Sequence, residues 1–306
     1  MEVTVLMSVY KEPLEMVKVA VDSIMNQTYT DILFLIIVDN PDNLEVIQYL
    51  QHLIKCDNRF EMIINSQNMG LAQSLNRGID RVVTPYLARM DADDIAEPDR
   101  LEKQIRYLKD NPTVDLLGAN IIFIDEQNRV IGNKTFFPCS SEAISEFMKY
   151  TNVLNHPTFM GKTSVFKEVK YRNLLYSQDY DFVCRLLEKN YVVNNLQDHL
   201  LKYRVASSIS NDKKQKQRVA FEQIRHYYRL NRLSTIDIER VVESSLKSYS
   251  ADYYKLVDTY NNFVSLLKKK YYLKAFSFLI KNLFVKGFFG ELINSFKVFL
   301  LKQKSR

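Results

Sequence analysis

Three carboxylates crowd into one short stretch of the chain, RMDADDI at residues 89–95. The residues before it are mostly apolar, so Asp91, Asp93 and Asp94 follow an expected buried strand. Carboxylates this close repel one another unless a cation joins them. Mg²⁺ and Mn²⁺ are commonly held by one or two carboxylates together with a substrate's phosphates. The stretch therefore predicts a metal–diphosphate site. The alternative is a solvated acidic turn, in which Asp93 or Asp94 caps the helix expected near residues 98–107.

Tyr10 and Asp39 also stand at the ends of apolar runs. Four such runs alternate with stretches of helical period: the runs are residues 3–10, 32–39, 60–65 and 86–91, and the helical stretches are 14–26, 44–54 and 71–82. This alternation predicts a mostly parallel sheet covered by helices on both faces. Ligands of such sheets bind beyond the carboxyl ends of the strands. We therefore expect Tyr10, Asp39 and Asp91 to belong to one site.

The middle of the chain is less regular. Residues 114–125 predict a strand pair or one long bent strand, residues 127–132 a turn, and residues 199–205 a final strand. Helices are expected at residues 142–150 and 177–190, the second with Ser177 as its N-cap. Residues 152–166 show no clear period.

Composition excludes several common protein classes. The chain has 306 residues, which predicts one large domain or a domain with an extension. Only 7 are glycine, and no dinucleotide-binding or P-loop fingerprint occurs. The 3 cysteines are far apart, which favours reduced thiols in a cytosolic protein. The first residues lack the basic start and long apolar core of a secretory signal.

Charge divides the chain into two unlike parts. Residues 1–212 contain 22 Lys and Arg against 29 Asp and Glu, whereas residues 213–306 contain 20 against 7. From about residue 211 the pattern becomes long, helical and rich in Lys, Tyr and Phe. We therefore expect one domain at residues 1–210 and a basic, aromatic-rich helical extension at residues 211–306.

The end of this extension is strongly apolar but broken by charges. No run over residues 275–304 approaches the ~18 apolar residues that a membrane span needs. Lys270, Lys274 and Lys281 fall on one helical face, a pattern typical of helices that lie in a membrane interface. Peripheral membrane contact is thus expected, and a helical bundle that forms a homodimer is the alternative. Nucleic-acid binding is not expected, because the apolar content is too high and no known module occurs.

Seven segments of the first 205 residues resemble the family-2 glycosyltransferases, above all the bacterial exopolysaccharide enzymes of the amylovoran-biosynthesis type. They occur in the family's order: VLMSVYKE (5–12), SIMNQTY (23–29), IIVDN (36–40), NMGLAQSLNRGI (68–79), RMDADDI (89–95), NHPTFM (155–160) and SQDYDFVCRLL (177–187). No single segment is decisive, but seven in order are specific. The resemblance implies the GT-A fold, an α/β fold that transfers sugars from nucleotide diphosphates.

The resemblance also implies roles for individual residues. Those expected to bind the donor UDP-sugar are Val9, Tyr10, Glu12, Asp39, Asn68, Asn76, Arg89, Asp91 and His156. Val9, Tyr10 and Glu12 would line the uracil and ribose pocket, and Asp39 would accept a hydrogen bond from the uracil ring. Asp91 and Asp93 would form the metal pair for Mn²⁺ or Mg²⁺, with Asp93 as the direct ligand. Asp179 would be the general base, with Asp181 as its competitor.

The implied reaction is an inverting transfer from the UDP-sugar to a hydroxyl of a saccharide acceptor, expected to be lipid-linked. Such a transfer is an in-line displacement that needs one base on the acceptor side and a metal on the departing diphosphate. The resemblance places it in bacterial surface polysaccharide synthesis, and the expected location is cytoplasmic, at the inner face of the cell membrane.

Three departures from the family pattern leave alternatives open. Residues 40–42 read Asn-Pro-Asp where the family often has D-G-S, Gln178 stands where Glu is common, and Ala206 stands where His is frequent. Gln178 and Ala206 motivate a second hypothesis, a catalytically silent subunit that binds a partner. A sugar nucleotidyltransferase is a third, but VYKEPLEM offers Lys11 without the glycines that a triphosphate loop requires.

Overall fold

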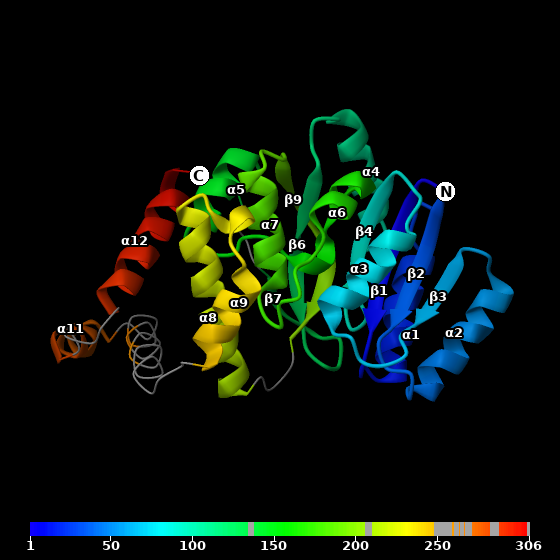
Figure 1. Cartoon of the computed structure of the whole chain (residues 1–306), viewed down its shortest axis with the longest axis horizontal. Coiled ribbons are helices and arrows are strands. Elements are labelled where there is room, and N and C mark those ends of the chain that lie inside the picture. The colour runs from blue at the N-terminus through cyan, green and yellow to red at the C-terminus, as the bar shows by residue number, and fades with distance from the viewer. Residues whose placement is uncertain are drawn as a thin grey trace.

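The computed structural model describes residues 1–133, 138–205, 210–247, 271–281 and 288–304, together with Thr259, Phe263 and Leu266. Ala206 and Lys270, which entered the expectations above, lie outside these residues. The first part of the chain alternates strands and helices, as the sequence predicts (Figure 1). These elements are β1 (Val3–Val9), α1 (Leu14–Met25), β2 (Ile32–Val38), α2 (Leu44–Cys56), β3 (Phe60–Ile64), α3 (Leu71–Arg81) and β4 (Tyr86–Asp91).

These four strands form a parallel sheet in the order β3-β2-β1-β4. Val9 pairs with Val38, and Ser8 pairs with Asp91, so the carboxyl ends of β1, β2 and β4 meet at one edge. Successive side chains of a strand point to opposite faces. Leu6 accordingly packs with α3, whereas Val5 packs with α1 and α4, in two separate core clusters. The sheet thus holds the strand ends rigidly at one edge.

The second part makes the sheet mixed. It adds β5 (Ile95–Ala96), α4 (Arg100–Asp110), β6 (Leu116–Ile124), β7 (Val130–Asn133), α5 (Ser141–Met148), the 3-10 turn η1 (His156–Thr158), β8 (Met160–Lys162), α6 (Thr163–Val169), α7 (Gln178–Glu188) and β9 (Val193–Arg204). The full order is β3-β2-β1-β4-β8-β6-β9-β5, with β7 on β6. β8 is antiparallel to both β4 and β6, while β6 and β9 are parallel.

Several element bounds in this part differ from expectation. Of residues 127–132, expected as a turn, those before Val130 form the turn and the rest belong to β7, and the last strand begins at Val193 rather than at residue 199. The period-free residues 152–166 fold into η1, β8 and the start of α6. Ser177 precedes α7 but does not cap it, because its backbone is left-handed at φ 57° and its hydroxyl donates to the carbonyl oxygen of Gln217.

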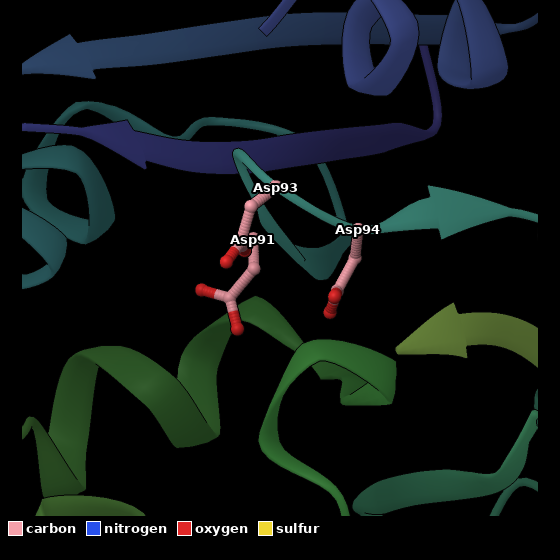
Figure 2. A group of neighbouring side chains, drawn as sticks. All are labelled: Asp91, Asp93 and Asp94. Atoms are coloured by element: carbon pink, nitrogen blue, oxygen red, sulfur yellow. The ribbon is translucent and has the colours of Figure 1, made fainter. Parts of the chain in front are cut away.

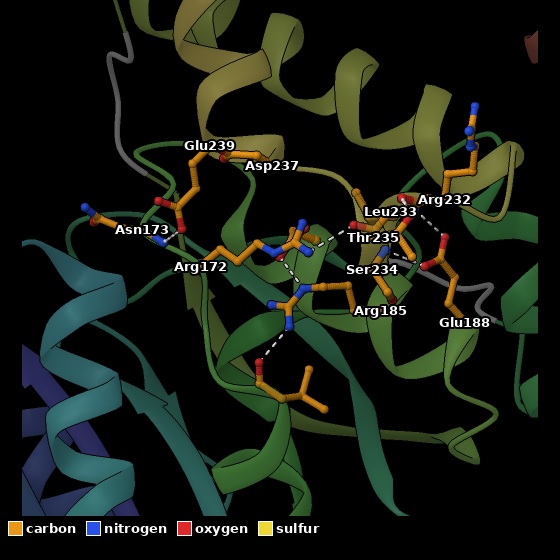
Figure 3. Close-up of polar contacts among 12 residues, drawn as sticks. Arg172, Asn173, Arg185, Glu188, Arg232, Leu233, Ser234, Thr235, Asp237 and Glu239 are labelled. Atoms are coloured by element: carbon orange, nitrogen blue, oxygen red, sulfur yellow. Dashed lines mark hydrogen bonds and ion pairs between the residues drawn. The ribbon is translucent and has the colours of Figure 1, made fainter.

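The helical extension begins with α8 (Asn211–Arg229), the 3-10 turn η2 (Leu233–Thr235) and α9 (Ile238–Lys247). Ile224 of α8 and Val242 of α9 belong to the same core cluster as Phe182 of α7. Polar contacts fix the η2 turn (Figure 3): the Glu188 carboxylate accepts from the backbone nitrogens of Leu233 at 2.9 Å and Ser234 at 2.7 Å. The domain boundary expected at residue 210 reflects a change in composition. The hydrophobic core, however, continues from α7 into α8 and α9 across that boundary.

In the described part of the extension, two further helices follow, α11 (Tyr272–Lys281) and α12 (Phe288–Lys304). Val298 and Leu301 of α12 pack against the core cluster that includes α8. The opposite side of α12 leaves apolar side chains in solvent, with Phe296 60% and Phe299 54% exposed. Among the residues that the structure describes, none of the helices combines the length and apolar content needed to span a bilayer.

Candidate active site

The acidic stretch lies at the end of β4 and in the turn before β5. The side chains of Asp91, Asp93 and Asp94 project to the same side of this turn (Figure 2), and one ligand oxygen from each lies within 4.8 Å of the others. Burial, with the nearby charges of Asp91 and Glu12, raises the pKa of Asp93 to about 6. Burial and the charges of Asp91 and Asp93 raise the pKa of Asp94 well above its ordinary value. The cluster is thus short of positive charge.

Arginines surround this cluster but do not use all of its oxygens. Arg89 is 2% exposed and forms an ion pair with Asp91. Arg204, at the end of β9, donates its backbone nitrogen to Asp94 at 2.8 Å and its Nε to the carbonyl oxygen of Asp93 at 2.7 Å. Asp94 Oδ2 is buried and has no hydrogen-bond partner among the described residues. The helix-capping alternative is wrong, because Asp99 is the residue that precedes α4.

A divalent cation fits this arrangement. Three hard oxygen donors converge, one buried oxygen lacks a partner among the described residues, and burial together with mutual repulsion raises the pKa of two of the carboxyl groups. Those are the features that a Mg²⁺ or Mn²⁺ ion would relieve. Asp94, which the sequence did not assign to the metal, belongs to the candidate donor set with Asp91 and Asp93.

A cavity of about 300 Å³ opens beside Asp91. Its walls come from the ends of β4, β6 and β9, from η1 and from α7, and its lining residues include Arg89, Asp91, Asn155, His156, Asp179 and Tyr203. His156 Nε2 lies 2.8 Å from the Tyr171 hydroxyl, and burial together with Arg89 lowers the pKa of His156 well below its ordinary value. His156 is therefore a neutral polar wall of the cavity at physiological pH.

Asp179 and Asp181 lie in the first turn of α7 but face different surroundings. Asp179 lines the cavity, and its Oδ2 accepts from Asn152 Nδ2 at 3.0 Å. Burial raises the pKa of Asp179, against the lowering effect of hydrogen bonds from Tyr180 and Asn152. Asp181 is 0% exposed and ion-paired with Arg185 at 2.8 Å. Only Asp179 is therefore placed to meet a substrate in this cavity.

A second cavity, of about 570 Å³, lies beyond the ends of β1 and β2. Tyr10 and Asn68 line it, together with Lys11 and the Asn-Pro-Asp segment at residues 40–42. Glu12 supports this wall, because its Oε2 accepts from the backbone nitrogen of Tyr10 at 2.7 Å. Val9 contributes through its backbone, since its carbonyl oxygen accepts from the nitrogen of Asp39 at 2.7 Å.

Asp39 and Asn76 lie behind these cavities rather than in their linings. The buried Asp39 carboxylate accepts from the backbone nitrogens of Met69 and Gly70, each at 2.8 Å, and from Asn65 Nδ2 at 2.6 Å. It thereby fixes the loop that places Asn68, in which Gly70 adopts φ 82°. Asn76 binds both backbone groups of Tyr171 through its amide, at 2.7 and 2.9 Å. Their expected donor contacts stay predictions.

Sequence reasoning missed Tyr203, Asn152 and Phe123. Tyr203 and Phe123 line the cavity with ring centroids 6.2 Å apart, and Asn152 holds Asp179. Tyr203 falls in the strand expected at residues 199–205, where the pattern predicts a strand but not a contact with the cavity. Asn152 falls in the period-free stretch, where no pattern separates an active-site residue from a loop residue.

The mixed sheet and the helices that cover it define a fold of the GT-A type. Staphylococcus aureus TarS, residues 1–349 in complex with UDP-GlcNAc, superimposes with a TM-score of 0.57 at 14% identity, over 77% of this chain and 73% of that one. Such identity establishes the fold alone, and it confirms the fold expected from the sequence.

Residues 4–170 match the description "Glycosyl transferase family 2", so the chain belongs to that family. It is 37% identical over 221 residues to an uncharacterized glycosyltransferase of Methanocaldococcus jannaschii, covering 70% of this chain and 75% of the relative. It is 33% identical over 229 residues to the O-antigen biosynthesis glycosyltransferase WbnJ of Escherichia coli, covering 74% and 86%. The amylovoran biosynthesis glycosyltransferase AmsE of Erwinia amylovora is 31% identical over 217 residues, covering 69% and 79%.

Proposed function

We propose that this protein is an inverting, metal-dependent glycosyltransferase that moves a sugar from a UDP-sugar to a hydroxyl of a saccharide acceptor. The proposal rests on one observation: Asp91, of the acidic cluster, and Asp179, a half-buried carboxylate with a raised pKa, line the same 300 Å³ cavity. A leaving diphosphate needs positive charge, and an acceptor hydroxyl needs a base. In this cavity the departing diphosphate would lie beside Asp91 and the acceptor hydroxyl beside Asp179.

The donor nucleotide would occupy the cavity beyond β1 and β2. Tyr10 offers a ring face for the base, while Val9, Glu12 and Asn68 shape the wall. Asp39 would act here through the loop that it holds. TarS, which shares the fold, binds UDP-GlcNAc, and this supports a UDP-sugar as the donor.

Asp93 and Asp91 would hold the divalent cation, with the unpartnered oxygen of Asp94 close by. When bound, that cation would neutralise charge on the departing diphosphate. Arg89 would supply further positive charge near the diphosphate. Its guanidinium is paired with Asp91 and has two other nitrogens without partners among the described residues. Both nitrogens are buried, so Arg89 would act on the diphosphate through its charge rather than by direct contact.

The transfer itself would depend on Asp179. Its carboxylate would take the proton of the acceptor hydroxyl while that oxygen bonds to the anomeric carbon, and the bond to the diphosphate would break on the opposite side. Configuration therefore inverts. Asn152 would fix the carboxylate so that one oxygen faces the acceptor. The neutral His156 would not compete for the proton, because its Nε2 is engaged with Tyr171.

Surface polysaccharide synthesis, at the inner face of the cell membrane, is the proposed setting. Two relatives are named for O-antigen and amylovoran biosynthesis. The exposed face of α12, with Phe296 and Phe299, suits a bilayer interface, and the excess of Lys and Arg in the extension suits an anionic one. A lipid-linked acceptor would be presented at that surface.

The test is a screen of UDP-sugars for Mn²⁺-dependent hydrolysis and transfer. We expect one donor to be turned over, with activity lost on chelation and restored by Mn²⁺. Asp179→Asn should lower transfer by about 10²–10⁴-fold, the usual contribution of a general base, while UDP binding is retained. Absence of turnover with every donor, alongside intact UDP binding, would instead establish the silent-subunit hypothesis.

A further inference from the structure

A buried cation near the acidic cluster has no part in the proposed function. Arg100, the first residue of α4, is 0% exposed. Its side-chain nitrogens have hydrogen-bond partners, yet it forms no ion pair with a carboxylate in the part of the chain that the structure describes. A buried charge without a paired counter-charge opposes folding, because burial removes it from water. Charges at a longer distance must therefore compensate that of Arg100.

The acceptors of Arg100 are uncharged and hold its guanidinium next to β4. Nη2 donates to the carbonyl oxygen of Arg89 at 2.6 Å, Nη1 lies 3.3 Å from the sulfur of Met90, and Nε donates to Gln104 Oε1 at 3.1 Å. Arg89 and Met90 directly precede Asp91. Because consecutive Cα atoms are about 3.8 Å apart, the guanidinium lies within about 10 Å of the Asp91 backbone.

Gln104 prevents Arg100 from turning away from this position. Gln104 is also fully buried, and its Nε2 donates to the carbonyl oxygen of Thr158 at 2.8 Å. The Thr158 hydroxyl oxygen in turn accepts from the backbone nitrogen of Ala119 in β6 at 3.0 Å. The chain of contacts thus joins α4 to β4, η1 and β6, three elements that form walls of the 300 Å³ cavity. The charge of Arg100 is therefore fixed in place.

The carboxylates that act on Arg100 are those of the candidate metal site. Burial and the charge of Arg89 lower the pKa of Arg100 to about 9, while the charges of Asp94 and Asp91 raise it. Arg100 thus stays protonated at neutral pH. Charges inside a protein are poorly screened by salt and interact over several ångströms. Arg100 and a divalent cation would therefore repel each other while both are attracted to the same carboxylates.

We infer that Arg100 is a positioning residue whose fixed charge weakens the hold of Asp91, Asp93 and Asp94 on a divalent cation that binds without the donor. A cation that binds alone would leave the site readily, whereas one that binds with the donor also gains the oxygens of its diphosphate. The inference describes how the protein regulates the metal site of the proposed function, and it rests on that function.

Mn²⁺ binding without nucleotide tests this apart from turnover. Free Mn²⁺ would be measured by electron paramagnetic resonance as metal is titrated into the protein. Arg100→Met should tighten binding by at least about tenfold, because a repelling charge is removed, whereas Arg100→Lys keeps the charge and should stay within about threefold of the wild type. A disturbed site would bind the metal less tightly, so tighter binding cannot come from structural damage.

A second pair of variants leaves Arg100 in place and covers the case that Arg100→Met does not fold. Gln104→Glu puts a carboxylate against Nε of Arg100 and should tighten Mn²⁺ binding by at least about threefold. Gln104→Met loses the same bond to Thr158 without adding charge and should not tighten it. Arg106→Met removes a cation from α4 that is 66% exposed and should leave Mn²⁺ binding unchanged.

The outcomes separate this inference from the proposed function. Mn²⁺ binding that is no tighter in Arg100→Met and Gln104→Glu than in the wild type would overturn the inference alone. Tighter binding in these variants together with a failed donor screen would refute the catalytic proposal and leave the role of Arg100 intact. If none of the proteins binds Mn²⁺, with or without UDP, both the inference and the metal dependence of the proposed function are wrong.

Discussion

At the scale of single residues, α7 separates the carboxylate that the resemblance names as the base, Asp179, from its competitor, Asp181. Asp179 and Asp181 are two positions apart, which turns them about 200° around a helix. Asp179 lines the cavities of about 300 and 520 Å³ and accepts a hydrogen bond from Asn152. Asp181 is buried against Arg185 and Arg172. The choice of Asp179 as the base therefore follows from which side of α7 faces these cavities.

The raised pKa of Asp179 predicts the acid limb of the pH–rate profile. A general base works deprotonated, so activity should fall as pH drops through its folded-state pKa, and burial moves that pKa above the ordinary value of 3.8. Saturating Mn²⁺ and donor keep the acidic cluster from titrating in the same range. We expect the limb of kcat to lie above the ordinary aspartate range. A limb at or below 3.8 would contradict the assignment of Asp179.

At the scale of elements, the regular half of the fold was predictable and the irregular half was not. The first strands are continuous apolar runs that end in polar residues, and the pattern located β1, β2, β3 and β4 to within one residue. β8 has only three residues, Met160–Lys162, and pairs with strands on both sides through distant contacts. Such short elements follow from tertiary pairing and leave no period in the sequence.

The residues of the candidate site also fall into those that the sequence could predict and those that it could not. The acidic cluster could be predicted because it is local, lying within one turn after β4. Asn152 and the α8 residues that line the 520 Å³ cavity could not be predicted, because they are distant from Asp179 in the chain. Asn152 lies 27 positions before Asp179, and the α8 residues lie more than 30 positions after it. Only the fold brings them together.

A matched pair of substitutions on α7 tests the separation of roles. Asp181→Asn should destabilise the protein by about 3–5 kcal/mol, because it leaves Arg185 and Arg172 buried without their counter-charge. Asp179→Asn should not, since a carboxyl group with a raised folded pKa opposes folding at neutral pH and its neutral replacement removes that cost. Denaturant unfolding measures both. Equal losses of stability would show that the two carboxylates have similar structural roles.

At the scale of the whole molecule, the extension takes part in the site. α8 shares the core of the GT-A part, the Glu188 contacts fix its turn into α9, and α12 lines a cavity of about 520 Å³ that also includes Asp179. The face of α12 that carries Val298 packs inward, and the face that carries Phe296 looks outward. Deleting residues 275–306 would therefore remove a cavity wall together with any membrane contact, so point substitutions give a cleaner test.

Phe296→Gln combined with Phe299→Gln should weaken binding to vesicles that contain phosphatidylglycerol by at least about tenfold, because each buried apolar side chain contributes about 1.5–3 kcal/mol. Both side chains point away from the core, so folding and UDP binding should be unchanged. Val83→Gln removes an apolar side chain that is even more exposed, at 87%, and lies far from α12 in sequence, so it is the control. Cosedimentation, with and without the anionic lipid, measures the effect. Vesicle binding that is unchanged while a dimer dissociates would assign this face to a second copy of the chain.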